Sequence, residues 1–374
     1  MTIKKVLVTG GAGFIGSHLV DELLARRYAV RVVDALVPQV HKKQGTPEHL
    51  DPRAEFIEGD VCDPVLLARA LDGVDVVYHQ AAEVGVGQSM YEPVRYMRAN
   101  TLGTTMLLEE ISKNRRGVRK LVVASSMSIY GEGEYECKNC GRVAPRLRSA
   151  LQLRAKEWEV RCPQCGGALT PVPTMEAKPL VPTSVYAISK QDQEQLCLVM
   201  GRAYGIPTVA LRYFNVYGTR QALSNPYTGL CAIFSARLLN DKTPLVFEDG
   251  EQSRDFVHVS DIVQANLLAI EKSDADYEAM NVGTGVATTV NQMAKLLSDG
   301  LGKNIPGEIT GQYREGDIRH CVADLSKAKR LLGYSPKVSL KDGLRELLAW
   351  VREQSARDLV PQMQKELAAR NLVY

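Results

Sequence analysis

The stretch that decides the fold is KKVLVTGGAGFIGSHLVDELL, residues 4–24. It begins with a short apolar run that ends in the glycines Gly10, Gly11 and Gly13. From Phe14 to Leu24, apolar residues then recur at helical spacing. This order of features predicts a strand, a tight turn and a helix.

The same pattern continues along the chain. Runs such as VDVVYH (74–79) and KLVVAS (120–125) are apolar on both faces, which is typical of a parallel sheet covered by helices on both sides. We therefore expect an α/β fold, Rossmann-like, with a doubly wound parallel sheet. Its predicted strands are 4–8, 30–33, 55–58, 74–79, 120–125 and 208–213.

After about residue 216 the pattern changes, and helices predicted at 230–240, 261–270, 290–299, 325–332 and 340–351 indicate a smaller α/β lobe. We expect a dinucleotide-binding domain at 1–215, which includes an insertion at 132–182. A substrate lobe at 216–374 would follow, with segments such as 255–270 packing back on the first domain. The last twenty residues predict a solvated amphipathic helix.

Length and composition limit the class of protein. A chain of 374 residues suggests about two domains, and 45% hydrophobic with 24% charged residues excludes a disordered or collagen-like chain. The net charge of +3 excludes a chain-wide basic surface for nucleic acid. Because no apolar run reaches 18 residues, we expect no membrane span and a soluble, cytoplasmic protein.

The glycine-rich turn predicts a nucleotide site. Gly10, Gly13 and Gly16 let the backbone approach a pyrophosphate at the start of a helix. Asp34 ends the second strand, where a carboxylate accepts a hydrogen bond from a ribose 2′-OH and repels a 2′-phosphate. NAD is therefore favoured over NADP. Asp60 follows the third strand, and it would either lie near the adenine or start the next helix.

Tyr186 and Lys190 form a candidate catalytic pair. They are four residues apart, so a helix places both side chains on one face. An ammonium beside a phenol, close to a cationic nicotinamide, lowers the phenol's pKa and suits it to act as a base. Ser126, at the end of an earlier strand, would hydrogen-bond the same substrate hydroxyl.

At this point the chain resembles the extended short-chain dehydrogenase/reductase family, and within it the nucleotide-sugar epimerases. The matching segments are TGGAGFIG (9–16), GDV (59–61), HQAA (79–82), SSMSIYG (125–131), YAISK (186–190), RYFNVYG (212–218), RDFVHV (254–259) and REGD (314–317). They extend over nearly the whole chain outside the insertion.

The resemblance implies site residues of three kinds. Ser126, Tyr186 and Lys190 would be catalytic. The cofactor NAD would be bound by Gly10, Gly13, Phe14, Ile15, Gly16, Asp34, Asp60, Val61, Ala81, Ala82, Asn100, Ser125, Tyr186, Lys190 and Tyr213. The nucleotide-sugar substrate would be bound by Val86, Gln88, Ser126, Asn215, Arg254, Arg314 and Asp317, and guanidinium groups suit its diphosphate.

Met127 and Ser128 narrow the reaction. The resemblance places an Asp-Glu pair at these positions in 4,6-dehydratases and a Glu in decarboxylases of sugar acids, whereas neither residue here can transfer the required proton. We therefore expect a 4-epimerase, in which Tyr186 takes the 4-OH proton as hydride moves to NAD. The 4-keto sugar then turns over and is reduced on its other face.

The predicted substrate follows from the loop VGVGQSMYE (84–92), which lacks a charged group for a sugar acid. The chain is most similar to the dTDP-L-rhamnose 4-epimerase subgroup, which interconverts that sugar with its 6-deoxy-L-talose epimer. UDP-glucose 4-epimerase is the close alternative, and an NDP-4-ketosugar reductase is another. A remote alternative is a non-enzymatic NAD-sensing protein that binds nucleic acid.

The insertion carries two cysteine pairs, Cys137/Cys140 and Cys162/Cys165, each followed by glycine. Two such pairs predict a zinc ribbon with four thiolate ligands and therefore a structural metal. Two disulfides are the alternative, which a cytoplasmic location disfavours. Since the insertion leaves the chain after Ser126 and returns before Tyr186, we hypothesise that it folds beside the active-site mouth and shapes substrate access.

The resemblance also implies a homodimer, built from helices at 93–114 and 186–204. The remaining cysteines, Cys62, Cys197, Cys231 and Cys321, are interpreted as buried packing residues. The expected partner is thus a nucleotide-sugar substrate and a second copy of the chain, with no membrane and no nucleic acid. The basic composition of residues 141–161, six Lys and Arg against two Glu, is the feature that keeps the nucleic-acid alternative open.

Overall fold

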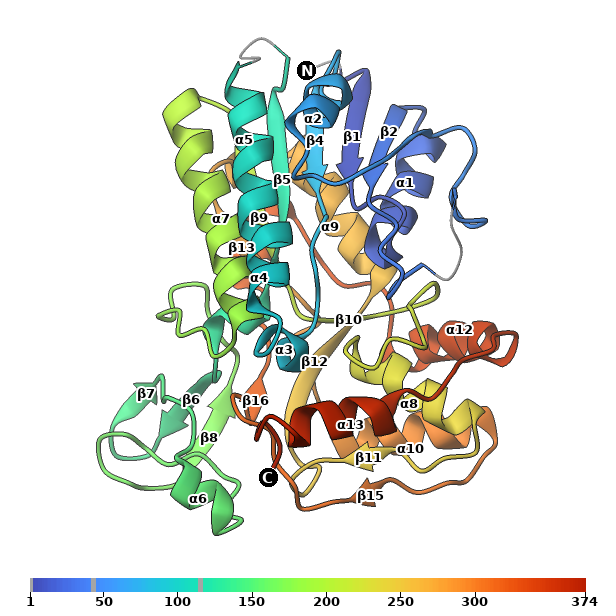
Figure 1. Ribbon diagram of the computed structural model, residues 1–374. Coiled ribbons are helices and arrows are strands. Elements are labelled where there is room, and N and C mark those ends of the chain that lie inside the picture. Colours follow the sequence, from blue (N-terminus) through green and yellow to red (C-terminus); the bar gives the residue numbers. More distant parts are fainter. Residues whose placement is uncertain (1–2, 42–44, 114–116) are drawn as a thin grey trace.

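The computed structural model describes residues 3–41, 45–113 and 117–374, and its largest part is a seven-stranded sheet (Figure 1). Every strand pairing in this sheet is parallel, in the order β13-β9-β5-β4-β1-β2-β3. The doubly wound sheet is confirmed. Its strands are β1 (Lys5–Thr9), β2 (Ala29–Asp34), β3 (Glu55–Glu58), β4 (Val76–His79), β5 (Lys120–Ser126), β9 (Thr208–Tyr213) and β13 (Ala279–Val282).

Helices cover both faces of the sheet because its strands are apolar on both sides. One buried cluster joins the sheet to α2 (Pro64–Ala70), α5 (Gly103–Lys113) and α7 (Val185–Tyr204). A second cluster joins the other face to α1 (Phe14–Ala25), α9 (Val259–Glu271) and α11 (Ser326–Leu332). Between β4 and α5 lie α3 (Val86–Ser89), α4 (Pro93–Tyr96) and a π-helical turn at Met97–Leu102.

The smaller lobe lies below the carboxyl ends of the central strands (Figure 1). Its core packs α8, α10 and α12 together. Residues after 216 also return to the large sheet, through α9 and through β13 at its edge. The elements of the lobe are β10 (Asn215–Tyr217), α8 (Leu230–Leu239), β11 (Leu245–Val246), β12 (Ser253–His258), β14 (Ala287–Thr289), α10 (Val290–Leu301), β15 (Glu308–Ile309), β16 (His320–Cys321), α12 (Leu340–Arg352) and α13 (Val360–Ala368).

The insertion folds as a small unit beside this lobe (Figure 1). Its three-stranded antiparallel sheet has the order β7-β6-β8, and a short helix stands apart from the sheet. The unit leaves β5 through a 3-10 turn at Met127–Tyr130 and rejoins the chain before α7. Its elements are β6 (Glu134–Cys137), β7 (Gly141–Val143), α6 (Ala150–Arg154) and β8 (Leu169–Val172).

The C-terminal helix corrects one expectation. The last residues predicted a solvated helix, but Val360, Met363 and Leu367 of α13 are buried. They form a cluster with Tyr91 and Tyr227, which belong to two distant loops. The helix is amphipathic, and its apolar face packs on the molecule instead of lying in water.

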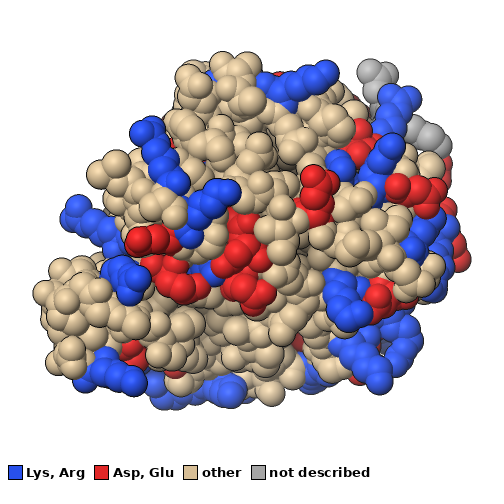
Figure 2. Space-filling view, turned by 90° about the horizontal axis from the view of Figure 1, so that it is seen from below, with Lys and Arg blue, Asp and Glu red and all other residues tan. Residues whose placement is uncertain are grey.

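Surface charge is mixed on the face seen from below (Figure 2). Acidic side chains gather near its middle and basic side chains lie around its margins. Two of the six cations in residues 141–161 are already paired, Arg142 with Glu134 and Arg148 with Glu248. Basic side chains on this face are thus interrupted by acidic ones (Figure 2). In the described part of the chain, no helix combines the length and the apolar character needed to span a bilayer.

Candidate active site and candidate metal centre

The glycine-rich turn between β1 and α1 has the backbone geometry of a dinucleotide cradle. Gly10 has φ +68°, and a Cβ there would lie 2.7 Å from the backbone nitrogen of Ala81. A Cβ on Gly16 would lie 2.1 Å from the carbonyl oxygen of Gly10. Gly13 caps α1 without a side-chain hydrogen bond, so the helix N-terminus is open to an external anion. These residues fit the pyrophosphate of NAD.

Asp34 lies beside this cradle at the end of β2. Its carboxylate accepts hydrogen bonds from the backbone nitrogens of Ala12 and Leu36, both at 3.0 Å. Asp60 does not start the next helix, because Asp63 caps α2 by accepting from two backbone N–H groups. The carboxylate of Asp60 instead forms an ion pair with Arg98 at 3.1 Å.

The polar groups of three other expected cofactor residues are bonded within the protein. The amide of Asn100 donates to Ser189 Oγ at 2.8 Å. The Ser125 hydroxyl donates to Glu194 at 2.7 Å, and the Tyr213 hydroxyl accepts from Asn266 at 2.7 Å. Of the remaining expected residues, Phe14 and Ile15 begin α1 after the cradle, Ala81 lies beside Gly10, and Val61 belongs to the buried core; Ala82 follows Ala81 in the chain.

Tyr186 and Lys190 lie in the first turns of α7, which Ser184 caps by accepting from a backbone N–H. The Lys190 ammonium donates to the carbonyl oxygen of Ala124 on β5 and to Gln193 Oε1. Burial lowers the pKa of Lys190 to about 7, against the opposing effect of nearby acidic groups.

Burial also raises the pKa of Tyr186, although the neighbouring Ser126 hydroxyl acts to lower it. The protein alone therefore does not lower the pKa of this phenol. From the spacing of Tyr186 and Lys190 we expected a lowered pKa, with NAD bound nearby. Ser126 Oγ accepts hydrogen bonds from the backbone nitrogen of Ser128 at 3.1 Å and from its hydroxyl at 2.9 Å.

A cavity of about 270 Å³ lies between the sheet and the smaller lobe. Of the expected substrate residues, the structure brings Val86, Asn215, Arg254, Arg314 and Asp317 to its wall, together with Met127 and Ser128. The side-chain oxygen of Asn215 is buried and has no hydrogen-bond partner among the described residues. An unpaired buried acceptor in a cavity wall is suited to a ligand that donates a hydrogen bond.

The structure does not bring Ser126 to the cavity wall, although its neighbours Met127 and Ser128 line it, and it does not bring Gln88 there either. The side chain of Gln88 is buried, where its Oε1 accepts hydrogen bonds from Gln39 at 2.9 Å and from the Tyr96 hydroxyl at 3.1 Å. Nearby Val86 is 41% exposed and lines the cavity. Only one of the two residues expected from this loop therefore lines the cavity.

Two arginines meet at one carboxylate in the cavity wall. Asp317 Oδ1 lies 3.2 Å from Arg254 Nη2, and Asp317 Oδ2 lies 2.7 Å from Arg314 Nη2. Burial acts to raise the pKa of Asp317, but the two guanidinium groups outweigh it and hold the pKa below its usual value. Arg314 also lies over the ring of Phe247, 4.7 Å from its centroid. The cluster carries net positive charge beside the cavity.

Sequence reasoning missed the apolar wall of this cavity. Phe234 of α8, Phe247 and the α13 residues Val360, Met363 and Leu367 all line it. The spacing of the three α13 residues is visible in the sequence, but it does not tell which surface their face covers.

The four cysteines of the insertion form a candidate metal centre. The sulfur atoms of Cys137, Cys140, Cys162 and Cys165 all lie within 4.8 Å of one another, and those of Cys137 and Cys165 are 3.6 Å apart. Tetrahedral zinc with Zn–S bonds of about 2.3 Å requires sulfur atoms about 3.8 Å apart. The glycines after the pairs, Gly141 and Gly166, have φ of +72° and +71°, as tight knuckles require.

Burial acts to raise the pKa of Cys162, but the backbone N–H groups of Cys165 and Gln164, together with neighbouring thiols, lower it to about 7. A thiolate is the form that binds a metal. A hydrogen bond with Cys165 instead raises the pKa of Cys140 to about 12. The fit of the cluster to a site with four thiolate ligands therefore rests on the spacing of its sulfur atoms. The other four cysteines are buried, as expected.

Comparison with known proteins connects these features to one family. The profile of the NAD dependent epimerase/dehydratase family matches residues 6–150 and 164–283. A dTDP-L-rhamnose 4-epimerase from Burkholderia thailandensis is 35% identical over 360 residues, which cover 95% of this chain and 96% of that protein.

Solved structures agree with the sequence match. A UDP-glucose 4-epimerase from Thermotoga maritima, solved with UDP-glucose, has a TM-score of 0.77 and 36% identity, and the match covers 93% of this chain and 99% of that one. A UDP-glucuronic acid 4-epimerase from Bacillus cereus, solved with UDP-glucuronic acid and NAD, has a TM-score of 0.76 and 30% identity over the same shares of the two chains.

Proposed function

The chain belongs to the NAD dependent epimerase/dehydratase family, and from this premise we propose that it is a nucleotide-sugar 4-epimerase that acts on a dTDP- or UDP-hexose. We favour dTDP-L-rhamnose and its 4-epimer, the 6-deoxy-L-talose derivative, as the substrate pair. UDP-glucose and UDP-galactose are the alternative pair.

The observation that carries the proposal is the cavity wall. Asn215 presents an unpaired buried acceptor there, and Arg254 and Arg314 present guanidinium groups beside it. Guanidinium groups match the oxygens of a diphosphate. Met127, Ser128 and Ser184, which lie close to Ser126 and Tyr186 in the chain, line the same cavity. One ligand would therefore be held by its diphosphate with its sugar directed toward Ser126 and Tyr186.

The proposed roles of the catalytic residues follow from this placement. Bound NAD would accept a hydride from carbon 4 and return it. Tyr186 would take the proton of the 4-OH and return it at the end of the cycle, with Ser126 orienting the same hydroxyl. The ammonium of Lys190 and the positive charge of bound NAD would together lie close to the phenol and favour its ionised form.

The two residues after Ser126 support epimerisation over 4,6-dehydration and over decarboxylation of a sugar acid. Met127 and Ser128 line the cavity, and neither carries a group that removes a proton from carbon 5 or protonates a leaving hydroxyl.

The preference for a 6-deoxy sugar rests on apolar lining. Val86, Met90 and Met127 all contribute to the cavity wall. A methyl group at carbon 5 would lose little hydration against such side chains, whereas a hydroxymethyl group would need a hydrogen-bond partner.

The test is an NMR assay at carbon 4 with dTDP-L-rhamnose, UDP-glucose and a GDP-sugar, each without added NADH. We expect equilibration of the dTDP sugar with no net consumption of cofactor. A requirement for stoichiometric NADH would instead identify a 4-ketosugar reductase. Turnover of UDP-glucose alone would overturn the preferred substrate but not the reaction.

We also propose two features of the assembled protein. The four cysteines of the insertion would bind a structural zinc ion, supported by the spacing of their sulfur atoms. Two chains would form a homodimer through the helices at 93–114 and 186–204; Asn114, the last residue of the first range, lies outside the described residues.

A further inference from the structure

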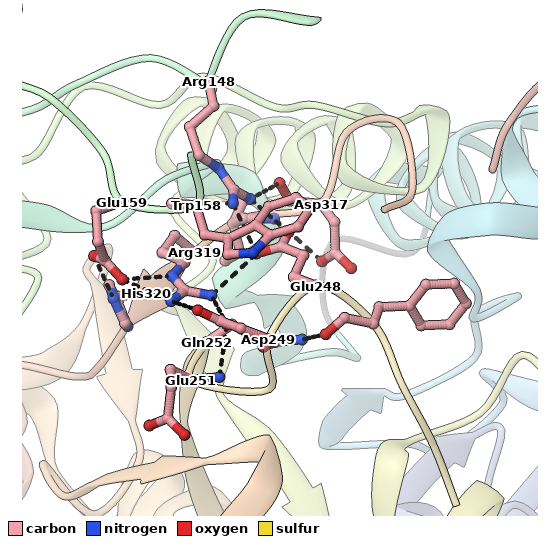
Figure 3. A network of polar contacts seen from close by, with 12 residues as sticks. Arg148, Trp158, Glu159, Glu248, Asp249, Glu251, Gln252, Asp317, Arg319 and His320 are labelled. Atoms are coloured by element: carbon pink, nitrogen blue, oxygen red, sulfur yellow. Dashed lines mark hydrogen bonds and ion pairs between the residues drawn. The ribbon is translucent and has the colours of Figure 1, made fainter. Parts of the chain in front are cut away.

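The insertion is joined to the smaller lobe by a buried ion pair (Figure 3). Arg148, between β7 and α6, meets the carboxylate of Glu248 with both terminal nitrogens, at 2.8 Å and 2.9 Å. The two side chains are only 1% and 3% exposed. Arg148 also donates to the carbonyl oxygen of Asp317 at 3.2 Å. It therefore reaches from the insertion to the segment that lines the cavity.

A second arginine extends the network from the other side. Arg319 lies 3.1 Å from Glu248, 2.6 Å from Asp249 and 2.6 Å from Glu159 of the insertion, and its side chain is 1% exposed. Glu132, at the start of the insertion, accepts the backbone N–H of Arg319 at 2.8 Å. Four residues of the insertion thus hydrogen-bond to the strip of residues 317–320, namely Glu132, Gly133, Arg148 and Glu159.

The opposite side of the same strip holds the cavity arginines. Arg254 donates to the carbonyl oxygens of Ile318 at 2.7 Å and Arg319 at 2.9 Å. Asp317 pairs with both Arg254 and Arg314. Arg148 and Glu159 are therefore connected to both cavity arginines through this short strip of backbone.

We propose that Arg148 and Glu248 are positioning residues: the insertion uses this pair to fix the strip 317–320, and through it Arg254 and Arg314, for the diphosphate of the substrate. This inference rests on the proposed function. It also explains why the insertion is attached to the smaller lobe. Arg148 is not among the residues that line the cavity, so it acts through the strip and not by touching the ligand.

Physical chemistry favours a positioning role for such a pair. Burying two charged groups costs solvation free energy, and the attraction between the two charges need not outweigh that cost. Apolar side chains would therefore hold the insertion as firmly as this ion pair does. A two-pronged arginine–carboxylate contact, however, fixes distance and angle together. Binding improves when the recognising groups are already in place before the ligand arrives.

The test uses the full-length protein with Arg148→Met, which keeps an unbranched side chain but removes its charge and its donors. Binding of dTDP and UDP is measured by calorimetry, and kcat and KM are measured on the nucleotide sugar that the protein turns over. We expect the Kd and the KM to rise about tenfold or more, while kcat and the bound NAD content stay near the wild-type values. Arg148→Lys keeps the charge without the planar fork and should recover only part of the affinity.

The matched control is Arg142→Met. Arg142 belongs to the same insertion and also forms an ion pair, but its partner is Glu134 of the insertion itself and its side chain is 38% exposed. It should leave the Kd and the KM unchanged. If Arg148→Met does not fold, Glu248→Gln tests the same pair from the other side at nearly constant volume.

Several results would overturn the inference. Wild-type affinity in Arg148→Met, an equal loss in Arg142→Met, or a fall in kcat at constant KM would each do so. Failure of both Arg148→Met and Glu248→Gln to fold would assign the pair to folding, which contradicts a role at the ligand site. A wild-type protein that binds neither dTDP nor UDP would instead overturn the proposed function, so the two failures are distinguishable.

Discussion

Tyr186 is the residue on which the proposed chemistry depends most directly. Its phenol is the one group near Ser126 and Lys190 that the mechanism requires to carry the substrate's proton. Tyr186→Phe removes only the hydroxyl, and we expect kcat to fall by about 10²- to 10⁴-fold. NMR at carbon 4 measures the loss, with the content of bound NAD as the control for an intact cofactor site. Full turnover in this variant would contradict the assignment.

His79 shows how a single buried side chain makes stability depend on pH. Its ring nitrogens contact the hydroxyl oxygens of Thr9 and Thr104 at 2.7 Å and 2.8 Å. Burial, with a smaller effect of Lys190, lowers its pKa from 6.5 to about 3. The unfolded chain therefore binds a proton before the folded one does as the pH falls.

The consequence is a loss of stability with acid. The contribution of His79 to the free energy of unfolding is complete above pH 6.5 and is lost as the pH falls toward about 3. It amounts to roughly 4 kcal/mol over that window. We expect the free energy of unfolding, measured with urea, to fall less steeply as the pH is lowered across this range in His79→Gln than in the wild type. The variant keeps the other five histidines. An identical slope in the variant and the wild type would be inconsistent with a neutral buried imidazole.

At the scale of elements, the insertion is too small for a large core and instead has a cluster that contains its cysteines. That cluster joins Tyr135, Val143 and Val160 to Cys137 and Cys162. The proposed structural metal would supply folding free energy that so few apolar residues cannot.

Cys162→Ser should therefore lose the zinc and loosen the insertion. We expect about one zinc per chain in the wild type and much less in the variant, together with faster proteolysis between residues 132 and 182. Mass spectrometry of the metal content and limited proteolysis measure the two effects. Cys62→Ser is the control, because Cys62 is buried far along the chain from the cluster. Equal zinc in both variants would refute the site.

At the scale of the whole molecule, apolar side chains are exposed on two helices, and the proposed dimer would bury these side chains. Val94 of α4 is 79% exposed, and Ile188 and Val199 of α7 are 43% and 59% exposed. These helices pack side by side at one side of the sheet (Figure 1). Exposed apolar residues grouped on neighbouring elements are typical of a protein–protein interface.

Sedimentation of the wild type should accordingly give the mass of two chains, and Val199→Glu should shift it toward one chain. Val65→Glu is the matched control, because Val65 is 79% exposed on α2. A wild-type monomer at micromolar concentration would exclude the dimer.

The site residues that could be predicted are those with a local spacing or a place at a strand end. The glycines at 10, 13 and 16, Asp34 and the pair Tyr186/Lys190 have this kind of signal, and so do the cysteine pairs. Gln88 was the exception among the loop residues: alternate residues of one loop cannot be sorted into cavity and core from their sequence, and the structure bonds Gln88 to Gln39 and Tyr96.

The sequence by itself determined the doubly wound sheet, the family and the residue types of the candidate centres. These depend on periodicity and on spacings of a few residues, which the backbone converts directly into strands, turns and helix faces. Only the tertiary structure decided that α13 closes the cavity and that Arg148 meets Glu248, one hundred residues away in sequence. Contacts at such separations leave no periodic signal, because their partners are chosen by how the lobes and the insertion pack together.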